Sequence, residues 1–565
     1  SAAHSIVKKS WVTDAANSIN KKFGVGLADV MASALEESVF EPYGIEQIKR
    51  ACPSPKTSTG SPADSVANAA AMIELITSGV RSQIMKQLQQ LPPGPEFDEH
   101  ANKLYAEVLV RIVAANATYR YTVYSAEARK VSSANQQRHS DSDDDNDAED
   151  AVCVANAKLM KGLLYAFEPF QEAHMMDRSR YRTAKLSRRE WQSSSETPGW
   201  DTVPLMTMVH RIQQAAHEGG SAVSSDSLTQ IVRSWRRLMV FLQSADEKVS
   251  PEFTRRRGAL AVVNGLLGML FQHNNTHQCR ALLQSVEQNE RIADSDPAQI
   301  SKSVLRPAAH MIAEIIKFRY YQGRMKLYEK KLADASASFA IAYRLTPALA
   351  QCSSPQRDNK LRIHFYWIVT GIISGQQPPK NLLQSDPLCH EIFTPILQAI
   401  SNGNPVDFCR AIDRHGTILR RRGVYMLLQQ ARILCYLYLI QRVHAIVGAI
   451  PGVDNSKLSV NLLLEAAKHV MSANSEVDAI EREDEQQQQQ QLQSAGGEDV
   501  IAGTRKYPRL HQIIADSLDV DAMCMWIARL ISRGFVRGYL SYEHKTLVLS
   551  KASPFPTIAA ASQQQ

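Results

Sequence analysis

The stretch DVDAMCMWIARLISRGFVRGYLSYEHKTLVLSKASPFP, residues 519–556, decides how the rest of the chain is read. Apolar residues recur at helical spacing after a capping Asp519 or Asp521, and Gly534 ends the predicted helix. Two β-prone runs joined by a polar loop follow the helix. These runs are residues 535–540 and 546–550. Helix, strand, loop and strand form the second half of a winged helix, a small α+β module.

The exposed side of this module is predicted to be positively charged. Between residues 501 and 551 the chain has eight Lys and Arg against four Asp and Glu, so more than half of its net charge of +7 lies there. Such a local excess says more about a binding surface than the modest total does. The basic residues expected on the exposed side are Arg529, Arg533, Arg537, His544, Lys545 and Lys551.

Composition favours helices for the rest of the chain. The 565 residues contain few aromatics and much Ala, Leu, Ile and Gln. Eight scattered cysteines, none in a CxxC motif, predict a reducing compartment and no metal site. The N-terminus lacks the continuous apolar segment of a signal peptide. The longest apolar run, Ile433–Ile440, is far too short to cross a membrane, so no membrane association is expected.

The N-terminal third is predicted to hold helices separated by charged loops. Residues 1–65 form a mixed, partly disordered segment, and 66–204 contain helices at 66–91, 97–130 and around 151–170. Residues 139–150 are acidic, which favours a solvated loop, with a docking tail for a basic partner as the alternative. Residues 178–189 are basic and are either a soluble loop or a phosphate contact.

Residues 205–395 are predicted to form an α-solenoid of helical hairpins. Ala335, Phe339 and Ala342 follow Gly323 and Tyr328 at the spacing of a tetratricopeptide-type hairpin, in which small residues let two helices approach closely. Each hairpin buries its apolar face by stacking on its neighbours, so a right-handed solenoid is expected. The predicted helices are Ile231–Leu242, Ala259–Gln272, His277–Val286, Ala308–Tyr321, Leu332–Tyr343 and Leu361–Ile373.

Residues 396–556 are predicted to continue the helices and end in the winged helix at about 501–556. A helix is expected at Val424–Val443, preceded by Arg420, Arg421 and Arg422. Three cations are unfavourable at a helix start, which suggests an acidic partner or a phosphate opposite them, although a solvated helix start is the simpler interpretation. The glutamine-rich residues 472–497 predict a disordered insertion, and 557–565 a disordered tail.

Enzymatic chemistry is not expected. Phosphate-binding loops, zinc-protease motifs, nucleophile elbows and calcium loops are all absent from the sequence. The sixteen histidines are dispersed, and paired carboxylates occur only in the acidic runs. Because catalysis needs a preorganised constellation, the sequence predicts no catalytic residue, no cofactor, no metal and no small-molecule substrate.

Four segments resemble consecutive parts of PCI domains, the modules of the proteasome lid and the signalosome. They are ALAVVNGLLGMLFQHNNTHQCRALLQSVE, YYQGRMKLYEKKLADASASFAIAYRL, ILQAISNGNPVDFCRAIDRHGTILRRRGVYMLLQQARI and LISRGFVRGYLSYEHKTLVLSKASPFP. The resemblance covers about 255–556 and is strongest to the PCI subunits of the nuclear-pore-associated transcription and mRNA export complex and their signalosome-related paralogues. Its most specific part surrounds Gly538, Tyr539, His544 and Pro554-Phe555-Pro556.

The resemblance implies a binding role. The subunit would dock on a large Sac/GANP-type scaffold, be braced by a small acidic Sem-type subunit, and bind RNA or DNA through phosphates in the nucleus, at the pore, with the cytoplasm as a second compartment. Arg529, Arg533, Arg537, His544, Lys545 and Lys551 would form the nucleic-acid platform, whereas Arg420, Arg421, Arg422 and Tyr542 would contact partners. Tyr539 is expected in the wing core, while Tyr542 could also stack on a base. Two alternatives remain: the positive face meets an acidic protein surface, or the chain is purely an assembly subunit.

Overall fold

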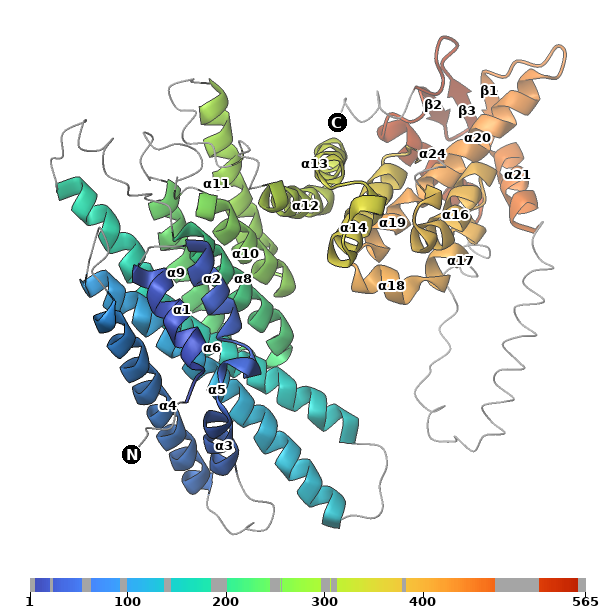
Figure 1. The fold of residues 1–565 in the computed structure, drawn as a ribbon. Helices are drawn as coiled ribbons and strands as arrows, with labels where there is room; N and C mark the ends of the chain where they lie inside the picture. The colour runs from blue at the N-terminus through green and yellow to red at the C-terminus, as the bar shows by residue number, and fades with distance from the viewer. Residues whose placement is uncertain are drawn as a thin grey trace. The chain divides into compact units, whose positions relative to one another are not determined.

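A computed structural model divides the chain into two compact units, Ser1–Tyr321 and Gln322–Gln565 (Figure 1). The sequence predicts domain boundaries after residues 204 and 395, whereas the boundary in the structure lies inside one helix, α12 (Ile312–Tyr328). The residues that the structure describes are 6–20, 24–52, 62–91, 99–136, 144–183, 201–243, 255, 257–295, 305, 312–376, 378, 383–472 and 518–556.

The first half of α12 belongs to the N-terminal unit through a buried polar network. The Glu314 carboxylate lies 3.1 Å from His210 Nε2 and accepts a 2.7 Å hydrogen bond from the Asn264 side-chain amide. Burial acts to raise the pKa of Glu314, but these hydrogen bonds outweigh it and hold the pKa below its ordinary value. The second half of α12 belongs to the C-terminal unit, where Gly323 packs against Phe339 so closely that a Cβ would lie 2.7 Å from the ring.

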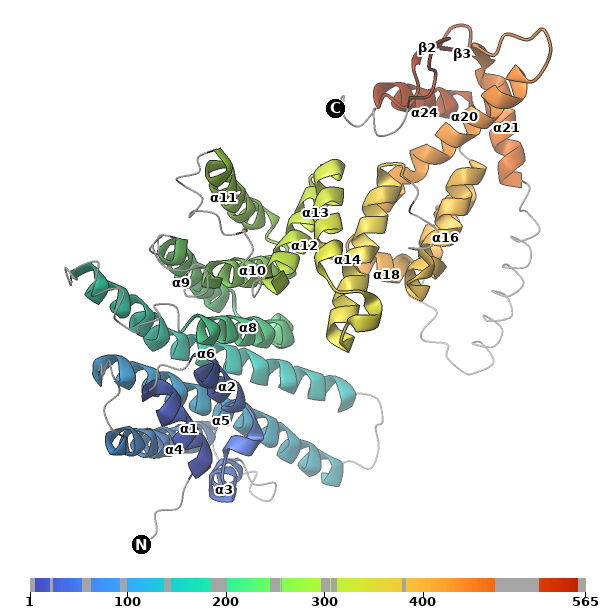
Figure 2. The ribbon, with the colours of Figure 1, turned by 45° about the horizontal axis from the view of Figure 1, so that its top comes forward.

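The N-terminal unit is built on long helices that lie side by side, with α4, α5 and α6 as its longest members (Figures 1 and 2). Phe167 on α6 stacks on Phe170 and contacts Trp235 of α9, all three fully buried. The helices are α1 (Lys9–Asn20), α2 (Gly24–Ser33), α3 (Pro42–Ala51), α4 (Pro62–Gln90), α5 (Glu99–Gln136), α6 (Asp144–Thr183), α8 (Thr202–Gly219), α9 (Ser225–Gln243), α10 (Arg257–Gln272) and α11 (Thr276–Ser295).

Within segment 1–65, the described residues 6–20 and 24–52 are more ordered than the sequence predicts. Its helices α1, α2 and α3 pack on the unit because their apolar faces are buried, as Trp11 and Ile19 of α1 illustrate. A bridge between Val7 and Phe40 closes this segment on itself. Residues 53–61 of this segment lie outside the described residues.

The predicted charged loops are partly helical. Helix α6 begins at Asp144 and ends at Thr183, so it includes the end of the acidic segment 139–150 and the start of the basic segment 178–189. Acidic residues are favourable in the first turn of a helix, where the partial charge is positive, and this accounts for a helix that begins inside an acidic run. The remaining residues of both segments lie outside the described part.

The C-terminal unit begins with the hairpin predicted from its small residues, the second half of α12 followed by α13 (Leu332–Leu345). Further helices stack behind it and lead to the winged helix, so the predicted fold class, an α-solenoid with a terminal winged helix, is confirmed. All six helices predicted in the solenoid are present, as α9 to α14. The helices after α13 are α14 (Ser354–Ile373), α16 (Pro387–Asn402), α17 (Pro405–Arg414), α18 (Gly416–Arg421), α19 (Tyr425–Gln429), α20 (Ile433–Gly448), α21 (Val460–Ser472) and α24 (Val520–Ser532).

The single helix predicted at Val424–Val443 is broken. Helix α19 ends at Gln429, a 3-10 turn spans Gln430–Arg432, and α20 starts at Ile433. The two halves have different surroundings: α19 exposes Met426, whereas nearly every residue of 433–440 is buried. The turn between α19 and α20 lies at this change from a one-sided to an all-round apolar pattern.

A three-stranded antiparallel sheet completes the winged helix, with α20, α21 and α24 packed beside it (Figures 1 and 2). Its strands are β1 (Lys457–Ser459), β2 (Gly538–Ser541) and β3 (Thr546–Leu549), in the order β1-β3-β2. Asp519 caps α24 by accepting a 2.7 Å hydrogen bond from the Ala522 backbone N–H, and Gly534 follows the helix with a φ of 71°.

The winged helix starts well before the predicted residue 501, because strand β1 belongs to its sheet. This strand pairs with β3 on the side opposite β2, and Leu458 lies across from Leu547. A two-stranded sheet is marginally stable alone, so β1 and the following α21 are part of the module. The glutamine-rich segment 472–497 therefore interrupts the winged helix between α21 and α24 instead of preceding it. Residues 473–517 lie outside the described part.

Candidate nucleic-acid interface on the winged helix

The sheet has one buried and one outward side. Leu458, Leu540 and Leu547 lie opposite one another on the buried side, with Leu458 and Leu547 at most 1% exposed. The next row along the strands, Lys457, Val548 and Tyr539, therefore lies on the outward side, because side chains alternate along a strand and paired residues share a side. Tyr539 is 64% exposed. This corrects the expectation that Tyr539 belongs to the wing core.

Arg537 extends the outward side of the sheet. Its carbonyl accepts a 2.9 Å hydrogen bond from the Ser550 backbone N–H, which continues the β2–β3 ladder by one residue. Its own backbone N–H donates to the Pro554 carbonyl at 2.8 Å, and Phe555 contacts His444 of α20. The C-terminal prolines thus hold the backbone of Arg537 in place, while its side chain stays exposed. We call Lys457, Arg537, Tyr539 and Val548 the outer sheet face.

Gly538, the first residue of β2 and the neighbour of Arg537 and Tyr539, is required by close backbone approach. A Cβ at this position would clash with the carbonyl oxygen of Val548. The glycine therefore lets β2 lie against β3 at the point where Arg537 and Tyr539 are presented.

Lys545 and Tyr542 are bound to the module itself. Both donate hydrogen bonds to Asp521 Oδ1, at 3.0 and 2.9 Å, and the Lys545 ammonium lies 3.5 Å from the centre of the Tyr542 ring. The hydrogen bond from Lys545 lowers the pKa of Asp521, and the same contact raises the pKa of Lys545. The charge of Lys545, which is predicted to face nucleic acid, is therefore partly balanced before any ligand arrives.

Arg529 and Arg533 lie toward the other end of α24 from Asp521, roughly 12 and 18 Å along the helix at 1.5 Å per residue. Both are exposed. The Arg529 guanidinium lies 5.0 Å from the centre of the Trp526 ring, which Arg432 of the preceding 3-10 turn also approaches, at 4.9 Å. Arg533 follows the last turn of α24 as its C-cap. It has no such aromatic contact among the described residues.

Of the remaining predicted residues, Lys551 lies near the outer sheet face. It and Lys457 both act electrostatically on Asp454, whose pKa is lowered chiefly by hydrogen bonds from Ser456. His544 is exposed in the wing turn, away from Lys551 along the chain. The six predicted cations therefore do not lie together on one surface of the winged helix. Arg537 and Lys551 gather at the base of the sheet with Lys457, which sequence reasoning missed because it lies before the insertion.

The chain is 22% identical over 318 residues to PCI domain-containing protein 2 of Xenopus laevis, covering 56% of the chain and 61% of that protein. It is 25% identical over 316 residues to the Drosophila melanogaster PCI domain-containing protein 2 homolog, covering 56% and 62%. It is 26% identical over 292 residues to the Schizosaccharomyces pombe protein CSN12 homolog, covering 52% and 54%. These similarities support a PCI-domain subunit.

No family model matches the chain. The chain spans about six tenths of the length of the frog and fly relatives. None of the helices in the described ranges has the length and apolar character needed to cross a membrane.

The three predicted partner-binding arginines have different surroundings. Arg420 and Arg421 form the last turn of α18, where cations are favourable, so the conflict with a helix dipole that the sequence suggested does not exist. Arg420 lies over the Tyr425 ring at 4.8 Å. Arg422 is half-buried over Phe365 at 4.0 Å. Arg420 and Arg421 are both exposed, and Arg421 has no such aromatic contact among the described residues.

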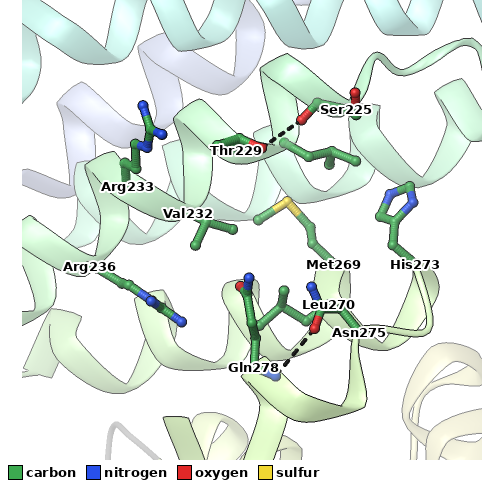
Figure 3. A pocket seen from close by; sticks show the side chains of 11 residues that line it. Ser225, Thr229, Val232, Arg233, Arg236, Met269, Leu270, His273, Asn275 and Gln278 are labelled. Atoms are coloured by element: carbon green, nitrogen blue, oxygen red, sulfur yellow. Dashed lines mark hydrogen bonds between the residues drawn. The ribbon is translucent and has the colours of Figure 1, made fainter. Parts of the chain in front are cut away.

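A pocket of about 430 Å³ lies between α9, α10 and α11 of the N-terminal unit (Figure 3). Arg236 extends from α9 toward Gln278, while Thr229 donates a 2.9 Å hydrogen bond to the Ser225 carbonyl. Among the described residues, His273 makes no hydrogen bond to Ser225 or Thr229, so the lining offers no nucleophile with a bound base.

Proposed function

We propose that this PCI-domain protein is a non-enzymatic subunit that docks on a large scaffold protein and, together with it, presents a basic winged-helix surface to nucleic acid. The process would be transcription-coupled mRNA export in the nucleus, at the nuclear pore. The observation that carries the nucleic-acid role is the outer sheet face, where an exposed Tyr539 lies in register with Lys457 and near Arg537.

The outer sheet face has the chemistry of a single-strand binding surface. Lys457, Arg537 and the adjacent Lys551 supply cations for phosphates, and Tyr539 supplies a ring on which any base can stack. Nothing in this set reads base edges, so binding would be independent of sequence and sensitive to salt. Arg533 would extend the positive surface along α24.

The resemblance to PCI subunits of the mRNA export complex suggests which partners this chain contacts. The large Sac/GANP-type scaffold would bring its own winged helix beside this one, and the small acidic Sem-type subunit would bind a positive part of the helical region. Arg421 suits such an acidic partner because it is exposed at the end of α18. Tyr542 is less suited to partner binding than predicted, because its hydroxyl is already bonded to Asp521.

A second candidate is a purely structural subunit of a signalosome- or proteasome-lid-like complex. The match to the S. pombe protein CSN12 homolog supports this candidate. The Lys545–Asp521 pair also fits this candidate, because the charge of Lys545 is then balanced where a nucleic-acid platform would need it.

Filter binding of single-stranded oligo-uridine at several salt concentrations tests the proposal. We expect Lys457→Glu combined with Arg537→Glu to abolish binding at low salt. Lys468→Glu is the matched control, because Lys468 is also exposed in the winged helix but pairs with Glu465 on α21. Equal loss in the double variant and the control would overturn the role of the outer sheet face.

Binding should be measured on the chain alone and on its complex with the scaffold, because the partner's winged helix forms part of the proposed surface. Affinity purification with mass spectrometry then separates the two candidates. A large scaffold with a small acidic protein supports the export subunit, whereas recovery of several other PCI-domain proteins supports the assembly subunit.

A further inference from the structure

Three potential metal ligands meet in the interior of the C-terminal unit. His364, Asp386 and Cys389 each offer one donor atom, and these atoms lie within 4.8 Å of one another. All three residues are buried, with exposed fractions of 0%, 4% and 0%. Sequence reasoning did not find this cluster, because His364 is far from the other two residues along the chain and no short motif connects them.

Two elements hold these side chains in place. His364 is in the middle of α14, whereas Asp386 is the N-cap of α16 and Cys389 lies in its first turn. Asp386 accepts a 3.0 Å hydrogen bond from the Leu388 backbone N–H through one carboxylate oxygen. This bond orients the carboxylate, and the spacing of three residues sets Asp386 and Cys389 on the same side of the helix start.

The surroundings of the His364 imidazole indicate that a ligand binds here. Neither Nδ1 nor Nε2 has a hydrogen-bond partner among the described residues, although the side chain is completely buried. The Tyr343 ring lies 5.6 Å away, centre to centre, and packs against the imidazole without accepting a conventional hydrogen bond. A buried polar group without a partner destabilises the folded state. Within the described part of the chain, the two ring nitrogens of His364 therefore lack a partner that a bound ligand would supply.

We propose that His364, Asp386 and Cys389 bind a zinc ion. Imidazole, thiolate and carboxylate are all established zinc ligands, and a thiolate with an imidazole disfavours calcium and magnesium. A tetrahedral site places ligand atoms about 3.5 Å apart, so the side chains need to close by about an ångström. A water molecule completes the tetrahedron.

Charge balance agrees with this assignment. Zn²⁺ is neutralised by the Asp386 carboxylate and the Cys389 thiolate, and the neutral imidazole of His364 adds no charge, so the buried site carries no net charge from ion and ligands. Formation of the site transfers the thiol proton of Cys389 to solvent while the Zn–S bond forms. Arg422, half-buried nearby, is the other charge that acts on Cys389.

A zinc ion at this position would tie α14 to the start of α16. The chain between these helices includes residues outside the described part, so a cross-link at His364, Asp386 and Cys389 would fix the junction independently of that connection. The ion would act as a structural element of the solenoid and is independent of nucleic-acid binding by the winged helix.

Metal analysis of the full chain tests the proposal. The protein is purified without chelators, equilibrated with zinc sulfate, dialysed and measured by inductively coupled plasma mass spectrometry. We expect one zinc per chain in the wild type and in Cys409→Ala, a matched control that removes another completely buried cysteine of the same unit. Cys389→Ala and His364→Phe should lose the zinc.

Cobalt substitution of the wild type keeps the test valid if those variants do not fold. Cobalt chloride added to the chelator-treated wild type should give a thiolate-to-cobalt charge-transfer band in the near ultraviolet, together with the visible bands of tetrahedral cobalt. Absence of zinc from the equilibrated, folded wild type, or a cobalt spectrum without the thiolate band, would overturn the proposal. Zinc retained at one equivalent in folded Cys389→Ala would also overturn it.

Discussion

Replacement of Leu458 by alanine tests whether strand β1 belongs to the winged helix. Leu458 is 1% exposed and lies opposite Leu547, which is completely buried. Truncation of a buried leucine to alanine costs about 2–5 kcal/mol through lost burial and the cavity left behind. If the winged helix started at about residue 501, as the sequence suggests, this substitution would lie outside the module and leave it unchanged.

Hydrogen exchange measured by mass spectrometry reports the effect where it should occur. A loss of at least about 2 kcal/mol corresponds to exchange that is faster by about 25-fold or more, at 1.4 kcal/mol for each factor of ten. We expect this acceleration in peptides that cover β3 and α24, on the far side of the glutamine-rich segment. Leu462→Ala in α21 is the control, because Leu462 is 47% exposed and its truncation should change stability by less than about 0.5 kcal/mol. Equal protection of β3 in the two variants would refute the assignment of β1 to the sheet.

Three further predictions concern packing, pH and binding. Gly323→Ala should destabilise the C-terminal unit by about 1–3 kcal/mol, because the new Cβ would lie 2.7 Å from the Phe339 ring; an unchanged thermal midpoint would contradict this close packing. Glu314 has a lowered pKa, so its contribution to stability should be complete above its ordinary value of 4.5 and be lost as the pH falls through the lower value of the folded state. The urea midpoints of wild type and Glu314→Gln should therefore differ by a constant amount at pH 5–7 and converge in stronger acid. A difference that grows in acid would show that folding raises the pKa of Glu314 instead of lowering it. Tyr539→Ala should weaken oligo-uridine binding by about 1–3 kcal/mol in a binding titration, without changing the salt dependence of binding. Tyr542→Ala is the control, because Tyr542 is similarly exposed. A larger loss of affinity in Tyr542→Ala than in Tyr539→Ala would place base stacking in the wing turn.

Local patterns predicted the helices and most of the winged helix. Apolar spacing defined the solenoid helices, and the small residues around Gly323 identified the α12–α13 hairpin because they act within one hairpin. The same holds for α24, β2 and β3, where Asp519 and Gly534 mark the ends of the helix. These features depend on neighbours within a few residues, so the sequence contains them directly.

Features that depend on distant partners were not predictable. Strand β1 has three residues, and only its pairing with β3 across a long insertion makes it a strand. The side of the sheet on which Tyr539 lies follows from that pairing. Lys545 could be identified as a cation, but its contact with Asp521 arises from the fold of the wing turn.

Ultraviolet cross-linking of oligo-uridine to the protein, in complex with its scaffold, tests the nucleic-acid role most directly. The cross-linked residue is identified by mass spectrometry of the digested complex. We predict that the cross-link falls on Tyr539 of β2, the exposed aromatic residue of the outer sheet face. A complex that binds the oligonucleotide but cross-links only outside the winged helix would contradict the proposal.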